Sequence, residues 1–112
     1  MKKLIEEVQD WIDEMNEDGY TGALDDLLEH GCQSGVVSGL IYYTDTVKFY
    51  DDHQVEIDNM LAATCDDLGC SPSGLFGKKW DNTDMLARDT HNKNLLAWFG
   101  FEETARTLSP DW

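Results

Sequence analysis

The cysteine and histidine side chains of this chain are the ones best suited to nucleophilic chemistry. Cys32 lies two residues after His30 in a glycine-rich segment, and His53 and His91 could approach it in the folded chain. A thiol nucleophile needs a base beside it, and a glycine-rich backbone can present N–H groups to a substrate. However, no local sequence here is typical of a cysteine protease. A buried thiol beside a helix-capping histidine is the favoured interpretation, so we predict no catalytic residue.

A zinc site is a second interpretation of the same residue types. The four candidate ligands are His30, Cys32, Cys65 and Cys70. Their spacing departs from the paired Cys or His clips of tetrahedral zinc sites. Cys65 also falls on an apolar stripe, where a small core residue is expected. We therefore expect no metal, no cofactor, and reduced cysteines of the kind found in cytoplasmic proteins.

Adjacent carboxylates recur along the chain, at Asp25-Asp26, Asp51-Asp52, Asp66-Asp67 and Glu102-Glu103. General acid/base catalysis requires two carboxylates in different environments within one cleft. Neighbouring residues on a helix point about 100° apart and do not face each other. The pairs also lack the alternating spacing of an EF-hand loop. They are predicted to be solvated surface.

A longer acidic face is predicted for the first helix. Its five carboxylates follow i, i+3, i+4 and i+7 relations: Glu6, Asp10, Asp13, Glu14 and Glu17. Successive helical turns place such groups about 5–6 Å apart along the axis. Phosphates on one DNA strand advance by about 3.4 Å per nucleotide along the helix axis, so the spacing of the carboxylates is loosely similar to that of phosphates. With Asp25 and Asp26, which continue the acidic region, these are the predicted partner-binding residues.

The charge of the whole chain indicates what kind of partner it could have. There are 23 acids against 8 lysines and arginines, a formal net charge of -15, and residues 1–30 alone hold ten acids and two lysines. Phosphate contacts need basic side chains, so direct binding to nucleic acid or to an anionic membrane is not expected. A basic protein is the expected partner. Trp80, beside Lys78 and Lys79, and Trp112 are candidate anchors of an interface.

Helical periodicity predicts an all-α fold in one domain, a compact bundle of about four to six helices. The expected helices cover 3–17, 21–30, 44–68 and 92–108, with no internal repeat or linker between them. Thr21 is the expected N-cap of the second helix and Gly31 its C-cap. Residues 36–43 suit either a buried strand or a short helix. We prefer the helix because a single strand would have no partner.

The third expected helix begins after the N-cap Thr44-Asp45. Its apolar stripe would comprise Val47, Tyr50, Gln54, Ile57, Leu61 and Cys65. A break near Asp51-Asp52 would let these residues cap a second segment. Ser71-Pro72 is a strong start signal for a short helix that ends at Gly77. The last helix could bend at Gly100.

The sequence shows no signal for export or for a membrane span. Lys2 and Lys3 resemble the start of a signal peptide, but Glu6, Glu7 and Asp10 interrupt any apolar region after them. No apolar run approaches the roughly 18 residues that a membrane span needs. A cytoplasmic location is expected.

Three segments carry a resemblance to a known group of proteins. They are 30–35 (HGCQSG), 40–46 (LIYYTDT) and 96–106 (LAWFGFEETAR). In these the chain resembles small acidic proteins of phages and other bacterial mobile elements, which are labelled as a domain of unknown function. The resemblance implies a genomic setting that includes anti-CRISPR and anti-restriction inhibitors of host defence, several of which mimic nucleic acid. It supplies no catalytic residues.

The leading hypothesis is a non-enzymatic inhibitor that occupies the basic groove of a host nucleic-acid-binding protein. A small enzyme that uses Cys32 with His30 or His53, or binds zinc, is the first alternative. A structural oligomer subunit is the second, and a homodimer is compatible with the sequence. The sequence does not name the partner.

Overall fold

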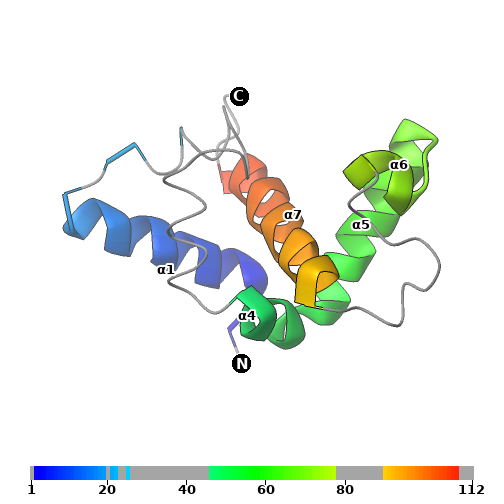
Figure 1. Cartoon of the computed structure of the whole chain (residues 1–112). Coiled ribbons are helices and arrows are strands. Elements are labelled where there is room, and N and C mark those ends of the chain that lie inside the picture. Colours follow the sequence, from blue (N-terminus) through cyan, green and yellow to red (C-terminus); the bar gives the residue numbers. More distant parts are fainter. Residues whose placement is uncertain (1, 20, 23–24, 26–45, 78–89, 109–112) are drawn as a thin grey trace.

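Helix α7 (Thr90–Leu108) is the element against which the other long helices pack, as a computed structural model of the chain shows. The structure describes residues 2–19, 21–22, 25, 46–77 and 90–108. Within these ranges the regular structure is entirely helical, which confirms the predicted all-α fold. Figure 1 shows α1 on one side of α7 and α5 and α6 on the other. None of the helices in these ranges combines the length and apolar character of a membrane span.

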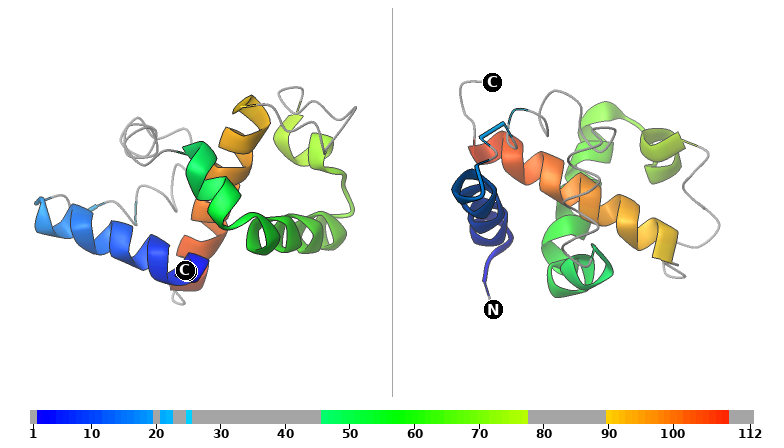
Figure 2. Two further views of the ribbon diagram at one scale, coloured as in Figure 1. Left: turned by 90° about the horizontal axis from the view of Figure 1, so that it is seen from below. Right: turned by 60° about the vertical axis from the view of Figure 1, so that its left-hand side comes forward.

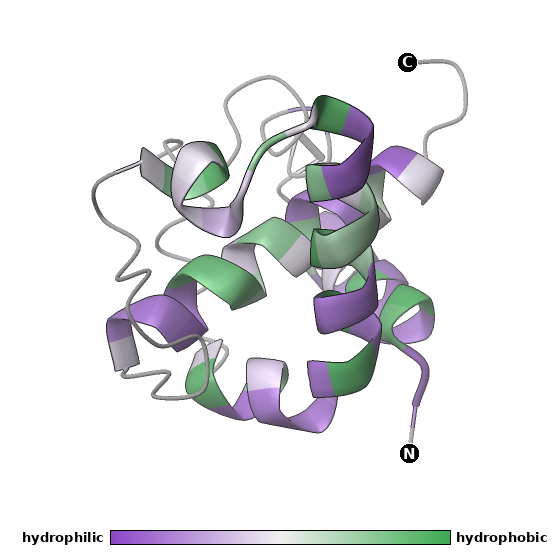
Figure 3. Cartoon of the chain, turned by 90° about the vertical axis from the view of Figure 1, so that its right-hand side faces the viewer, coloured by the Kyte–Doolittle hydropathy of each residue, from purple (hydrophilic) through white to green (hydrophobic). Residues whose placement is uncertain are grey.

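The middle of α7 is buried because three helices cover it. Its buried residues are Asn92, Leu95, Leu96, Ala97, Phe99, Gly100, Phe101, Thr104 and Ala105. The Phe101 ring lies 5.4 Å from that of Trp11 on α1 and stacks at 4.1 Å on that of Phe49 on α4. Figure 3 shows α7 changing from hydrophilic at its start to hydrophobic where it passes behind α5. One aromatic side chain therefore joins three helices.

Helix α1 (Leu4–Glu17) is amphipathic, as its sequence predicts. Leu4, Val8, Trp11 and Ile12 are buried against the core, and Asp18 and Gly19 end the helix. Each such side chain contributes about 1.5–3 kcal/mol when it is fully buried. This apolar stripe holds α1 on α7 and leaves its remaining face to solvent.

The predicted helix 44–68 is divided in two. One residue, His53, separates α4 (Thr46–Asp52) from α5 (Gln54–Leu68), and the two helices meet at an angle in Figure 2. The break that we expected is confirmed, but Asp51 and Asp52 do not cap α5. His53 occupies the N-cap position instead.

One residue of the predicted apolar stripe in this region faces solvent. Gln54 is exposed, because His53, one residue earlier, takes the buried position of that turn. Phe49 and His53 are buried in its place, and Tyr50, Ile57, Leu61 and Cys65 are buried as predicted. Val47 is half-buried.

Helix α6 (Pro72–Phe76) follows the start and stop signals of its sequence. The Ser71 hydroxyl accepts a hydrogen bond from the Gly74 N–H at 3.2 Å, and Gly77 has φ +69°. A serine N-cap, a proline at the first position and a glycine at the end are the signals from which it was predicted. Leu75 and Phe76 turn toward the core from this short helix.

Several sequence-based predictions lie outside the described residues. They are the helix at 36–43, the N-cap Thr44-Asp45, and most of the helix at 21–30. Within that last stretch, Thr21 and Gly22 lie in a turn and Asp25 is exposed.

Helix α7 continues through Gly100, where it crosses α5 closely. A Cβ placed on Gly100 would lie 2.9 Å from Cγ1 and 3.0 Å from Cδ1 of Ile57, which is completely buried. Real Cβ atoms essentially never come that close to another heavy atom. The glycine therefore serves the contact between two helices.

We expect Gly100→Ala to destabilise the fold by about 1–2 kcal/mol, because overpacking here outweighs the roughly 1 kcal/mol gain in helix propensity. In an Ile57→Ala background the nearest Ile57 atom that remains is Cβ, at 3.9 Å, so the same change should cost nothing or stabilise. Urea unfolding of the two single variants and the double variant measures this coupling. Strictly additive effects would contradict it.

Candidate partner-binding surface

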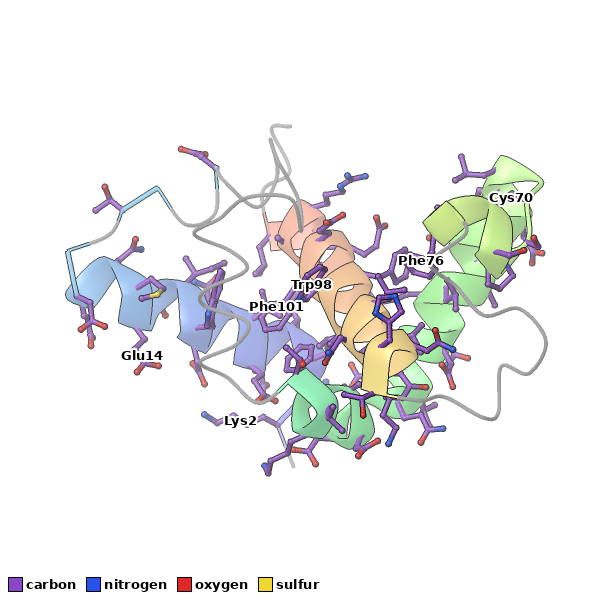
Figure 4. The ribbon with its side chains drawn as sticks, in the orientation of Figure 1. Lys2, Glu14, Cys70, Phe76, Trp98 and Phe101 are labelled. Carbon is purple, nitrogen blue, oxygen red and sulfur yellow. The ribbon has the colours of Figure 1, made fainter. Side chains whose placement is uncertain are left out.

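Six of the seven predicted binding acids are in the described part of the chain, and all six are exposed. Glu6, Asp10, Asp13, Glu14 and Glu17 project from α1, and Asp25 lies beyond its end; Asp26 is outside the described residues. Figure 4 shows Glu14 pointing away from the body of the molecule. The structure thus brings five of the predicted residues together on one helix and leaves them open to solvent.

Carboxylates are favourable at the N-terminal end of α1 and unfavourable at its C-terminal end. Glu6 and Glu7 lie in the first turn, where the helix dipole favours anions, and the Glu6 carboxylate accepts a hydrogen bond from the Lys3 N–H. Glu14 and Glu17 lie in the last turn, which has no basic residue. Anions at that end are unfavourable. These two acids therefore do not support the helix that carries them.

Ion pairing leaves much of the acidic face uncompensated. Lys2 pairs with Asp10, and the Asp13 carboxylate accepts a hydrogen bond from Gln9 Nε2 at 2.9 Å. The other ion pairs formed by lysines and arginines in the described ranges are Lys48–Asp52, Lys93–Asp51 and Arg106–Glu103. All three lie away from α1. Within the same ranges neither Glu14 nor Glu17 has a cationic partner.

The start of α1 is fixed by a buried histidine. The His53 side chain is 1% exposed and lies 5.1 Å, ring to ring, from Phe49. Its Nε2 contacts the Glu7 carboxylate, and its Nδ1 lies 3.4 Å from the Glu56 carboxylate. Glu56 also accepts a hydrogen bond from the Leu4 N–H at 3.2 Å. The α4–α5 junction therefore holds the first turn of α1 and fixes the position of the acidic face.

This arrangement argues against His53 as the base of a thiol nucleophile. Both of its ring nitrogens are committed to carboxylates, so neither is available to a cysteine. From the sequence, His53 was a candidate base, and its contacts with Glu7 and Glu56 were not anticipated. The only local signal for these contacts was the spacing of His53 and Glu56, which lie three residues apart at the helix break. His30 and Cys32, the other members of this alternative, lie outside the described residues.

The remaining candidate ligands do not form a metal cluster in the part of the chain that the structure describes. Cys65 is buried and Cys70 half-buried, both as free thiols at the end of α5. Burial is the main cause that raises the pKa of Cys65, and the neighbouring Cys70 and Asp66 raise it further. A raised pKa keeps this thiol protonated and weakens it as a nucleophile or ligand at neutral pH.

An apolar groove between α7 and the α5–α6 pair was not anticipated from the sequence. Its volume is about 270 Å³, its wall includes Leu68, Phe76 and Trp98, and Glu102, Glu103 and Arg106 also line it. Phe99 and Phe101 on the same helix are buried, whereas Trp98 is half-buried and borders the groove. Trp80 and Trp112, the predicted aromatic anchors, lie outside the described residues.

The groove and the acidic face are separate surfaces. Figure 1 places α1 and α6 on opposite sides of α7, and α1 meets α5 at their first turns, where the Leu4 N–H donates to Glu56. A partner that contacts the acids of α1 would not have to enter the groove.

Comparison with known proteins identifies the family but no activity. The chain belongs to the family described as Domain of unknown function (DUF7222), which matches residues 5–111. No curated protein and no solved structure shows a significant match to it.

Neutralising the end of α1 should stabilise the protein. We expect Glu14→Gln and Glu17→Gln each to raise the free energy of unfolding by a few tenths of a kcal/mol, because each removes an anion from the negative end of a helix. Glu6→Gln is the matched control and should lower it, since Glu6 lies at the favourable end. Urea unfolding at low ionic strength measures all three. The same sign at both ends would contradict this prediction.

Replacing His53 should loosen α1. His53→Ala removes a buried ring and both of its carboxylate contacts, and we expect a loss of about 2–3 kcal/mol in the free energy of unfolding. The exposed His91, on the first turn of α7, supplies the control. His91→Ala should change stability by less than about 0.5 kcal/mol. If the two variants unfolded at the same denaturant concentration, His53 would not be the residue that fixes α1.

Proposed function

We propose that this protein is a non-enzymatic inhibitor that binds a basic, nucleic-acid-binding protein of its host through the acidic face of α1. In this proposal the carboxylates occupy the groove that normally holds phosphates, in the manner of anti-CRISPR or anti-restriction inhibitors that mimic DNA. The partner-binding residues are Glu6, Asp10, Asp13, Glu14, Glu17, Asp25 and Asp26.

One observation carries the proposal. Glu14 and Glu17 are exposed, lack a cationic partner among the described residues, and lie at the helix end where anions are unfavourable. Carboxylates kept where they weaken their own helix are expected when they act on another molecule. Solubility alone does not require this placement. The net charge is -15, and it would stay far from zero if Glu14 and Glu17 were neutral.

Rigid placement supports the same conclusion. The apolar stripe of α1 packs on α7, and the contacts of Glu7 and Glu56 with His53 hold its first turn. A mimic of a regular polyanion needs its charges at fixed spacings, which a helix held at its N-terminal turn provides. The expected partner is therefore a protein with a basic groove, and direct binding to nucleic acid is not expected.

Binding should follow the local charge of α1. We expect the variant with Asp10, Asp13, Glu14 and Glu17 changed to Asn or Gln to bind the partner captured from host-cell extract at least tenfold more weakly at ~50 mM salt. The loss should lie mainly in the association rate, because long-range attraction steers the encounter. The wild type should lose affinity as salt rises, and the variant should lose less.

A control variant that loses four acids outside α1 distinguishes the position of the charges from the total charge of the protein. Changing Asp51, Asp52, Asp66 and Asp67 to Asn removes the same four charges from α4 and α5 and should weaken binding much less. DNA or RNA should compete with the wild type for the captured partner without binding the protein itself. Equal binding by the α1 variant and the wild type at both ~50 and ~500 mM salt would show that the acidic face serves only solubility.

A further inference from the structure

The end of α5 brings two cysteines together through the backbone. Gly69 adopts a left-handed conformation with φ +65°, and its N–H donates to the Asp66 carbonyl. The Cys70 N–H donates to the Cys65 carbonyl at 3.0 Å. These two bonds define a Schellman motif, in which the residues at the positions of Cys65 and Cys70 commonly form an apolar side-chain contact. In this chain both positions hold a thiol.

The separation of the two residues suits a disulfide. With 3.0 Å between the Cys70 nitrogen and the Cys65 oxygen, standard bond lengths limit their Cα atoms to about 7 Å apart at most. Disulfides join Cα atoms that are about 4.4–6.8 Å apart. The Cys70 side chain also packs against the apolar cluster that contains Cys65. The backbone thus does not need to rearrange before the two sulfurs can meet.

The two thiols differ in access. Cys65 is 8% exposed, whereas Cys70 is half-buried and reaches solvent. Both line a depression of about 390 Å³ together with Asp58, Leu61 and Pro72. A small disulfide in solution can therefore reach Cys70 first, with Cys65 placed behind it.

We propose that Cys65 and Cys70 form a redox modification site, which closes to an intramolecular disulfide by exchange with a low-molecular-weight disulfide such as oxidised glutathione. This proposal is independent of the binding function of α1. The Cys70 thiolate attacks one glutathione sulfur, which releases one glutathione thiolate and leaves a mixed disulfide. Cys65 then gives up its proton and attacks the Cys70 sulfur, which releases the second glutathione. Because burial raises the pKa of Cys65, this closing step is the slower of the two at neutral pH. Two protein thiols are oxidised, one glutathione disulfide is reduced to two thiols, and the protons of the protein thiols pass to the released thiolates.

Closure would act on the wall of the apolar groove. Cys70 precedes the N-cap of α6, and a Cβ placed on Gly74 of that helix would lie 3.3 Å from Cys70 Cβ. Helix α6 carries Leu75 and Phe76, and the Phe76 ring packs edge-on against Phe99 of α7. A covalent link from α5 to Cys70 therefore reduces the freedom of α6 to move against α5 and α7. Figure 4 shows Cys70 and Phe76 on this side of the molecule.

The test uses the folded full-length chain in a Cys32→Ser background, so that only one pair of thiols remains. After incubation with oxidised glutathione, we expect the intact mass to fall by two hydrogen atoms. Neither cysteine should then be alkylated, and digestion should yield a peptide linked between Cys65 and Cys70. Reduction with dithiothreitol should restore both thiols. The oxidised form should melt about 5 °C higher than the reduced form.

Two glycine variants distinguish the proposed geometry from chance proximity. Gly69→Ala disfavours the left-handed conformation on which the motif depends, so the mixed disulfide should persist measurably longer before closure. Gly77→Ala changes another glycine of positive φ outside the motif and should close like the parent. A stable glutathione adduct on Cys70 with Cys65 still alkylatable, or two thiols that stay unmodified, would overturn the proposal. So would equal closure rates of the Gly69→Ala and Gly77→Ala variants.

Discussion

The enclosure of α7 is the constraint on which the rest of this structure depends. Its middle section is apolar on several sides, so one covering helix would not be enough to bury it. Phe101 contacts Trp11 from α1 and Phe49 from α4, and Gly100 lets Ile57 of α5 pack directly against α7. In a chain of 112 residues, the apolar faces of α1, α4 and α5 are buried mainly against α7.

That constraint also determines where the charge lies. Because α1 gives its apolar stripe to α7, the five acids of its acidic face lie on the exposed side, and only Glu7 turns toward His53. The His53 contacts with Glu7 and Glu56 then fix the direction of the helix at its first turn. The acidic face is therefore a surface of defined orientation. Its last turn holds anions that have no cationic partner among the described residues and that the helix dipole disfavours, and this local cost is the physical reason for expecting an external partner.

Much of the fold follows from the sequence. Leu4, Val8, Trp11 and Ile12 recur at helical spacing and are buried as the pattern requires, and Ser71-Pro72 starts a helix where a serine cap and proline should. The exposed acids of α1 could likewise be placed from periodicity alone. Local signals of this kind depend only on neighbouring residues.

What the sequence did not reveal depends on contacts between distant residues. His53 is buried because Glu7, 46 residues earlier, reaches its ring, and no local pattern encodes that pairing. Gln54 was assigned to the apolar stripe, but His53, one residue earlier, takes the buried position of that turn. The close approach at Gly100 depends on Ile57 of another helix, and the groove beside Trp98 exists only once α5, α6 and α7 are assembled.

Zero-length carbodiimide crosslinking of the protein to the partner captured from host-cell extract tests the central claim most directly. This chemistry joins carboxylates to lysines that are already in contact, so the crosslinked peptides identify the binding surface. We expect crosslinks from Asp13, Glu14 and Glu17 to lysines of the partner, and their loss when nucleic acid is added in excess. Crosslinks confined to Glu102 and Glu103 beside the groove, or unchanged by nucleic acid, would contradict the proposed role of α1.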